Sequence, residues 1–168
     1  MHAARGGAAA DADAGTHAAG SPPYTGSVPA MAEVVTGDGY AVGSLDAMGE
    51  GPGFRKIRRE LGVTAFGINA IVLPPGIGGA LHYHDEQEET YFIHEGQVEF
   101  EFGDGSKHAL GPGGVTRVDA GTIRGMRNVG DKDAVIVIAG GKDGYVGRDA
   151  HLAPGESERV RAPETAGS

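Results

Sequence analysis

The sequence contains no cysteine, which excludes a disulfide framework, a thiolate metal site and a cysteine nucleophile. Aromatic residues are also scarce, at 6% of the chain. No apolar run approaches the roughly 18 to 20 residues that a membrane span needs, and the N-terminus shows neither a basic start nor an apolar targeting segment. We therefore expect a cytoplasmic protein that does not contact membranes.

Positive charge is scarce as well. The chain has 14 Lys and Arg residues against 23 Asp and Glu, a formal net charge of −9. Its only basic run, residues 55–59, is short. An acidic chain of this kind matches the phosphate backbone of nucleic acids poorly, so we expect no nucleic-acid partner.

Glycine is abundant, with 31 residues, and 9 prolines accompany it in a chain of 168. This composition favours frequent tight turns over long helices. The hydrophobic share of 39% is enough for one modest core, and the length suits one domain. The composition alone therefore favours a single all-β domain.

The two ends of the chain differ from its middle in composition. Residues 1–30 consist almost entirely of small and polar residues, which bury too little apolar surface to offset the entropy of ordering, so we expect a disordered tail. We expect the folded domain over residues 31–149 and a flexible polar tail over residues 150–168. Met31 is an alternative translation start.

From residue 64 onward, apolar residues recur with a period of two between short Gly and Pro breaks, as in a sandwich or barrel. Within residues 53–61 the pattern fits a helical turn and an edge strand equally well. The last predicted strand is apolar on both faces, so we expect it to be covered on each side. The predicted strands cover residues 65–73, 81–84, 89–93, 97–102, 107–110, 115–118, 122–128 and 134–139.

Two strand pairings are predicted from the turns between neighbouring strands. The strands at 89–93 and 97–102 flank Glu95-Gly96 and should form a hairpin. The strands at 115–118 and 122–128 should pair around the turn at 119–121.

His82 and His84 supply the clearest chemical signal. They are two residues apart in a predicted strand, so both side chains project from one face, about 6 to 7 Å apart along it. Glu89 can join them from the next strand. Two histidines and one carboxylate make a three-ligand site with open positions, suited to one divalent ion of iron, manganese, nickel or zinc.

The spacing around these residues extends to two glycines. Five residues separate Gly76 from His82, one separates His82 from His84, four separate His84 from Glu89, and six separate Glu89 from Gly96. This pattern resembles the first motif of the cupin superfamily at every marked position. The resemblance implies a small antiparallel β-barrel of jelly-roll type over residues 31–149, commonly dimeric, with the metal held inside the barrel. We accordingly expect a homodimer.

A second stretch resembles the other motif of the family but departs from it. Gly113, Gly121 and Asn128 have the family's spacing. Asp119, however, stands where the family usually has proline, and Arg124 where it has a metal-binding histidine. A guanidinium remains protonated and has no lone pair for a metal, so Arg124 is not a fourth ligand.

Two interpretations of Arg124 remain open. In the first, three ligands hold the metal, and Arg124 orients an anionic or enolisable group of a substrate. In the second, Arg124 pairs with Glu89 inside the barrel and takes the place of the cation. Tyr91 shares a strand face with Glu89, and we expect it either to line the pocket and offer its hydroxyl for catalysis or to fill the core.

Three further acidic and imidazole side chains are weaker candidates. Glu88 could replace Glu89 as a ligand, but strand alternation turns it away from the other ligands. His94 should point outward for the same reason, and we expect His108 to lie at the surface.

These observations lead to competing functional hypotheses. The first is a mononuclear metalloenzyme that acts on a small organic molecule, by oxygenase or by isomerase or cyclase chemistry. The alternative is a non-catalytic barrel that binds a small molecule, with an internal Glu89–Arg124 pair in place of the metal. A dimerising accessory protein with a vestigial pocket is a third.

Overall fold

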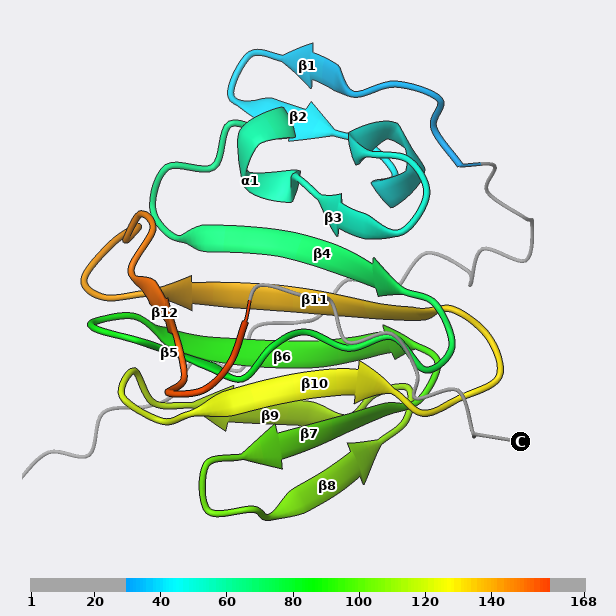
Figure 1. The fold of residues 1–168 in the computed structure, drawn as a ribbon. Coiled ribbons are helices and arrows are strands. Elements are labelled where there is room, and N and C mark those ends of the chain that lie inside the picture. Colours follow the sequence, from blue (N-terminus) through cyan, green and yellow to red (C-terminus); the bar gives the residue numbers. More distant parts are fainter. Residues whose placement is uncertain (1–29, 158–168) are drawn as a thin grey trace, which may run out of the picture.

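The computed structural model describes residues 30–157, and their strands build two five-stranded antiparallel sheets and a separate two-stranded hairpin (Figure 1). The first sheet has the order β3-β4-β11-β6-β9, the second the order β12-β5-β10-β7-β8, and β1 pairs with β2. The elements in chain order are β1 (Val35–Gly37), β2 (Tyr40–Val42), the 3₁₀ helix η1 (Leu45–Met48), β3 (Gly53–Arg55), α1 (Ile57–Glu60), β4 (Gly67–Leu73), β5 (His82–His84), β6 (Glu88–Glu95), β7 (Val98–Phe102), β8 (Lys107–Leu110), β9 (Val115–Val118), β10 (Arg124–Asn128), β11 (Ala134–Gly141) and β12 (Ala150–Leu152).

The core lies between the two sheets. Burial alternates along β6, so that Glu89, Tyr91 and Ile93 point inward while their neighbours face outward. Residues of β4, β7, β9 and β11 complete this core, with Phe100 and Ile136 among its most deeply buried side chains. The arrangement confirms the expected all-β fold of jelly-roll type.

Both predicted strand pairings are wrong. β6 pairs with β11 and β9, whereas β7 pairs with β10 and β8, so the expected hairpin is a crossing from one sheet to the other. β9 and β10 likewise lie in different sheets. The hairpin in this region is β7–β8, which turns through Gly103–Gly105 as the glycines there indicate.

The crossing from β6 to β7 depends on Gly96. Its φ is +79°, a conformation that residues with a side chain rarely adopt. A Cβ at this position would lie 2.6 Å from the Cα of Ala134, so the chain packs too closely for any other residue. Gly96 therefore permits a tight connection between the two sheets, and not the hairpin that the sequence predicts at this position.

The segment that precedes β4 covers the outer face of the first sheet. Residues 53–61, which fit both a strand and a helical turn, contain β3 followed by α1. Met48, Ile57 and Ala70 form a second core cluster, joined by Val137 of β11. This cluster covers the outer side of β11. The continuous apolar sequence of that strand predicts such a cover.

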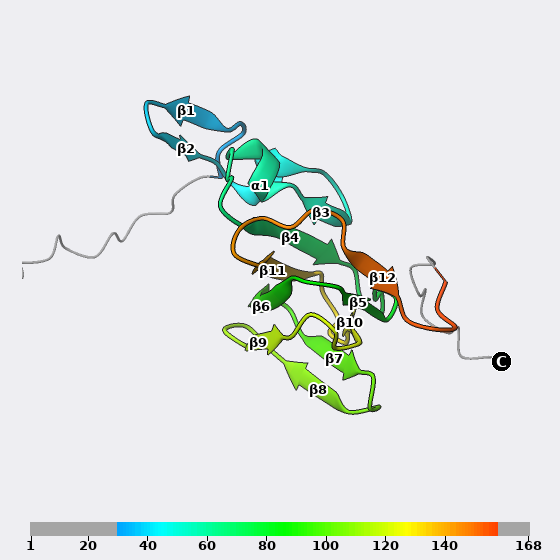
Figure 2. The ribbon, with the colours of Figure 1, turned by 90° about the vertical axis from the view of Figure 1, so that its left-hand side faces the viewer.

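The C-terminal part of the described chain joins the second sheet. Residues 150–152, placed by the sequence in a flexible tail, form β12, which pairs with β5 (Figure 2). A ladder with β5 holds this polar and exposed segment. The expected tails at 1–29 and 158–168 lie outside the described residues, within which no helix has the length and apolar character to cross a membrane.

Candidate metal centre

The sequence-predicted ligands come together inside the barrel. His82 and His84 lie on β5, Glu89 lies on β6, and one donor atom from each falls within 4.8 Å of the others. The two imidazole rings are 5.4 Å apart between centroids. The two residues of β5 share an inward face, and β6 brings the carboxylate to them from the opposite sheet.

Hydrogen bonds to the histidines determine which ring nitrogen is free. His82 Nδ1 lies 3.1 Å from the carbonyl oxygen of Ala80, which can only accept a hydrogen bond, so Nδ1 carries the proton. His84 Nδ1 lies 2.7 Å from a carboxylate oxygen of Asp149 and donates in the same way. In the neutral form of each ring, Nε2 is therefore the metal-binding atom.

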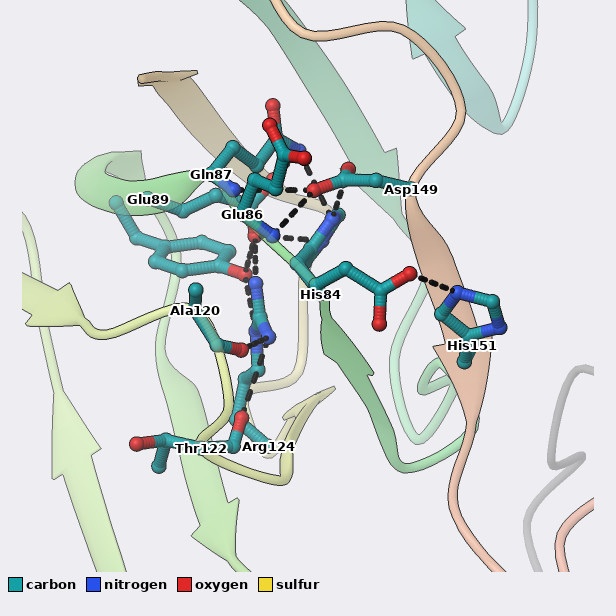
Figure 3. A network of polar contacts seen from close by, with 11 residues as sticks. His84, Glu86, Gln87, Glu89, Ala120, Thr122, Arg124, Asp149 and His151 are labelled. Carbon is teal, nitrogen blue, oxygen red and sulfur yellow. Dashed lines mark hydrogen bonds and ion pairs between the residues drawn. The ribbon is translucent and has the colours of Figure 1, made fainter.

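The carboxylate of Glu89 is surrounded by donors (Figure 3). Its Oε2 accepts hydrogen bonds from Arg124 Nη2 at 2.6 Å and from the hydroxyl of Tyr91, and it lies 3.4 Å from His84 Nε2. Burial alone would raise the pKa of Glu89, but the contacts with His84, Tyr91 and Arg124 outweigh it and lower the pKa to about 2. Glu89 is thus ionised at neutral pH.

The two histidines differ in their electrostatic surroundings. Burial lowers the pKa of His82 below its usual value. Burial acts in the same direction on His84, but its contacts with Glu89 and Asp149 prevail and raise its pKa. His82 is therefore the readier of the two to lose a proton to an incoming ion.

Arg124 is 1% exposed and directs its guanidinium at groups of the protein. Besides its bond to Glu89, Nε donates to the Tyr91 hydroxyl at 3.3 Å, and Nη1 donates to the carbonyl oxygens of Thr122 at 3.2 Å and Ala120 at 3.4 Å. Of the two sequence interpretations, the contacts correspond to the ion pair with Glu89. The guanidinium is not presented to open space, as a substrate clamp would require.

Asp149 contacts the candidate ligand His84, and the sequence pattern does not identify it. It precedes β12 and lies 65 positions from His84 in the chain. Its second oxygen accepts the backbone N–H groups of Glu86 at 3.1 Å and Gln87 at 3.0 Å. Despite burial, these bonds and the one from His84 lower the pKa of Asp149 to about 2. An ionised carboxylate therefore holds the His84 ring in place.

The weaker candidates lie outside the site. Glu88 is exposed and pairs with Arg117 at 2.9 Å, as strand alternation predicts. His94 and His108 are exposed too. Tyr91 is 2% exposed and its ring packs 5.3 Å from that of Phe100, so it fills the core and also bonds Glu89.

A groove of about 640 Å³ opens beside the site, and His82 is the one predicted ligand that lines it. Its walls come from both sheets and from the segment between β4 and β5. Most of its surface is apolar, contributed by Phe54, Ile71, Leu73, Ile77, Met126 and Leu152, among others.

Comparison with known proteins identifies the family. The model of the cupin domain matches residues 70–140, which include every ligand candidate and Arg124. These residues are a cupin domain. The match confirms the resemblance drawn from the two sequence motifs.

Several solved structures are similar to part of this chain. A cupin protein from Bacteroides fragilis is 23% identical, with a TM-score of 0.49, over 55% of this chain and 77% of that one. A protein with a double-stranded β-helix domain from Klebsiella pneumoniae is 22% identical, with a TM-score of 0.48, over 53% and 75%. A DMSP lyase from Ruegeria pomeroyi is 24% identical, with a TM-score of 0.47, over 53% of this chain and 43% of the lyase. No curated protein sequence matches.

The donor set of the cupin domain fits a divalent transition ion. Two ligands at about 2.1 Å from a tetrahedral ion are about 3.4 Å apart, which is the distance between His84 Nε2 and Glu89 Oε2. Arg124 and Tyr91 bond the same oxygen, so an ion here would share Oε2 with two hydrogen-bond donors. The other oxygen, Oε1, accepts from Gln87 Nε2 at 3.3 Å.

Proposed function

We propose that this cupin domain binds one divalent ion of iron, manganese, nickel or zinc through His82, His84 and Glu89 and acts enzymatically on a small organic molecule. The observation that carries the proposal is the pair of Nδ1 hydrogen bonds, to Ala80 and Asp149, which leave both Nε2 atoms as ligands. Metal-ligating histidines almost always donate their other ring N–H to a carboxylate or a backbone carbonyl in this way.

In this proposal the protein residues have distinct tasks. An ion at this site supplies Lewis-acid chemistry, or oxygenase chemistry where it is iron. Asp149 holds the His84 ring, and Arg124 with Tyr91 keeps the carboxylate of Glu89 ionised and in position. His82 lines the groove, so a substrate that reached an ion held by His82 would lie there. Oxygenase and isomerase or cyclase reactions both fit this division of tasks.

The 2.6 Å bond between Arg124 and Glu89 favours a second candidate function. The guanidinium already neutralises the buried carboxylate, as a metal would. The domain would then bind a small molecule without catalysing its conversion.

Metal analysis separates the two candidates. We expect protein purified without a histidine tag or chelator to contain close to one ion per chain by plasma mass spectrometry. His82→Ala should lose the ion and stay folded, while the control His108→Ala, an exposed histidine, should retain it. Arg124→His adds an imidazole beside the site and should tighten binding. Wild-type protein that takes up none of the four ions would favour the non-catalytic barrel.

The homodimer and the cytoplasmic location expected from the sequence stay predictions, and so do the domain boundaries. Sedimentation of the purified chain tests the first of these. A monomer at micromolar concentration would contradict it.

A further inference from the structure

We propose that the groove beside His82 selects an uncharged ligand with an apolar body. This inference rests on the proposed function, because it takes the ligand of the groove as the molecule on which the metal centre acts. One interpretation of the sequence is an anionic substrate oriented by Arg124. The composition of the groove favours an uncharged ligand instead.

The groove has no charged wall. Among the described residues that line it there is no Lys, Arg, Asp or Glu, and the only titratable side chains are His82 and His151. A charge on the body of a ligand that left water for these walls would lose its hydration without gaining a charged side chain as partner, which is costly. An apolar body gains from the same transfer.

His151 does not supply the missing polar contact. It pairs in register with Tyr83, so it lies on the opposite face of β12 from Leu152 and Ala150. Its ring stacks on that of Tyr83 at 5.4 Å, and its Nε2 lies 2.7 Å from a carboxylate oxygen of Asp85. Its imidazole is thus held on the outside of the sheet.

Arg124 is withheld from the groove as well. It does not line the groove, and its exposed fraction is 1%. Its donors are directed at Glu89, Tyr91 and two backbone carbonyls. The positive charge that could recognise an anion is thus already neutralised inside the barrel.

Apolar area in the groove remains open to a ligand. Phe54 is 56% exposed and Leu152 is 40% exposed, although both lie in the groove. Leu152 pairs directly with His82 across β12 and β5, so the apolar wall continues to the ligand candidate itself. The volume of about 640 Å³ lies within the range of small-molecule sites. These features place the apolar body along the groove and one polar group at His82.

A matched pair of fluorescent probes tests the selection of charge. N-phenyl-1-naphthylamine is neutral, and 8-anilinonaphthalene-1-sulfonate has the same ring system with an added sulfonate. We expect the neutral probe to saturate at one per chain and to bind at least about tenfold more tightly than the sulfonate. Equal or tighter binding of the sulfonate would overturn the inference.

Two phenylalanine variants locate the probe. Phe54→Ser should weaken binding of the neutral probe about tenfold, the change expected when roughly 50 Å² of apolar area is no longer buried by the ligand. Phe92→Ser removes an equally large side chain that is 41% exposed on the outer face of β6, away from the groove, and should leave binding unchanged. Leu152→Lys should reduce the preference for the neutral probe. Equal losses in both serine variants would contradict the location.

The same titration after metal removal with EDTA distinguishes the inference from the proposed function. If the protein takes up none of the four ions after EDTA treatment but still binds the neutral probe, the groove assignment is supported and the metalloenzyme is refuted. A metal-loaded chain that does not bind the neutral probe would refute the groove assignment alone. Probe binding that falls as sedimentation shows self-association would mean that a second copy of the chain occupies the groove, and would overturn the inference.

Discussion

Arg124→Met tests how the barrel tolerates the buried carboxylate of Glu89. Methionine approximates the length and apolar stem of arginine but removes its charge and its hydrogen-bond donors. Glu89, which is 9% exposed, would then lose its 2.6 Å partner. We expect a folded protein of clearly lower stability, because a buried charge without its partner is strongly unfavourable.

The size of the effect follows from the surroundings of Glu89. Its pKa is lowered from 4.5 to about 2 in spite of burial, which at about 1.36 kcal/mol per pKa unit favours the ionised form by about 3 kcal/mol. Loss of one partner from a buried pair costs about 3 to 5 kcal/mol. We expect the lower end, about 3 kcal/mol, because His84 and Tyr91 keep their contacts with the carboxylate. For a domain of this size, that lowers Tm by about 10 °C.

The pH dependence gives an independent check. Because folding lowers the pKa of Glu89, its ionisation stabilises the native state above pH 4.5, and this contribution is lost as the pH falls toward 2. The Tm of the wild type should therefore exceed that of Arg124→Met by the full amount at pH 7, and this difference should shrink between pH 4.5 and pH 2. Thermal melts by circular dichroism at several pH values measure it.

Controls separate the buried pair from ion pairs in general. Arg117→Met breaks the exposed contacts of Arg117 with Glu88 and Asp119 and should leave Tm nearly unchanged, because solvent screens exposed ion pairs. Adding Glu89→Gln to Arg124→Met should recover part of the loss, since the unpaired charge disappears. A divalent ion should also restore stability to Arg124→Met. An unchanged Tm at pH 7 would refute the reasoning, because Glu89 would then not depend on the guanidinium.

Two further predictions concern residues that support the ligands. Asp149→Asn should weaken metal binding about 10- to 100-fold in competition with a chelator, since His84 loses its ionised partner, while Asp85→Asn should have no such effect. Unchanged affinity in Asp149→Asn would remove that positioning role. Tyr91→Phe removes one of the two donors to Glu89 Oε2 and leaves the buried Arg124 Nε without its acceptor, so it should cost about 1 to 3 kcal/mol in urea denaturation, against little change in the exposed Tyr145→Phe. Equal stability of the two variants would contradict the inward hydroxyl contact.

The sequence predicts the ligand group because its signal is local. His82 and His84 lie on one face of one strand by alternation alone, and that rule also separates Glu89 from Glu88. The strand positions follow from the same alternation and from the glycines that end each run. These features depend on neighbouring residues, which the sequence displays directly.

The errors concern contacts between residues far apart in the chain. A short turn with glycine is compatible with a hairpin and with a crossing between sheets, and the packing of Gly96 against Ala134 decides between them. Asp149 and β12 were missed for the same reason, since no local pattern indicates that a polar segment will pair with β5. The contacts of Arg124 depend on the placement of β10 beside β5 and opposite β6.

The bond between His84 and Asp149 also sets the order in which the site is assembled. The two residues are 65 positions apart, and the second lies just before the last strand of the second sheet to be synthesised. During translation, His82, His84 and Glu89 emerge well before the carboxylate that orients His84. A nascent chain therefore offers an ion loosely held imidazoles, and the fully oriented site appears only when residues 149–152 dock on β5. Under the proposed function, tight metal loading would consequently follow the closure of the barrel.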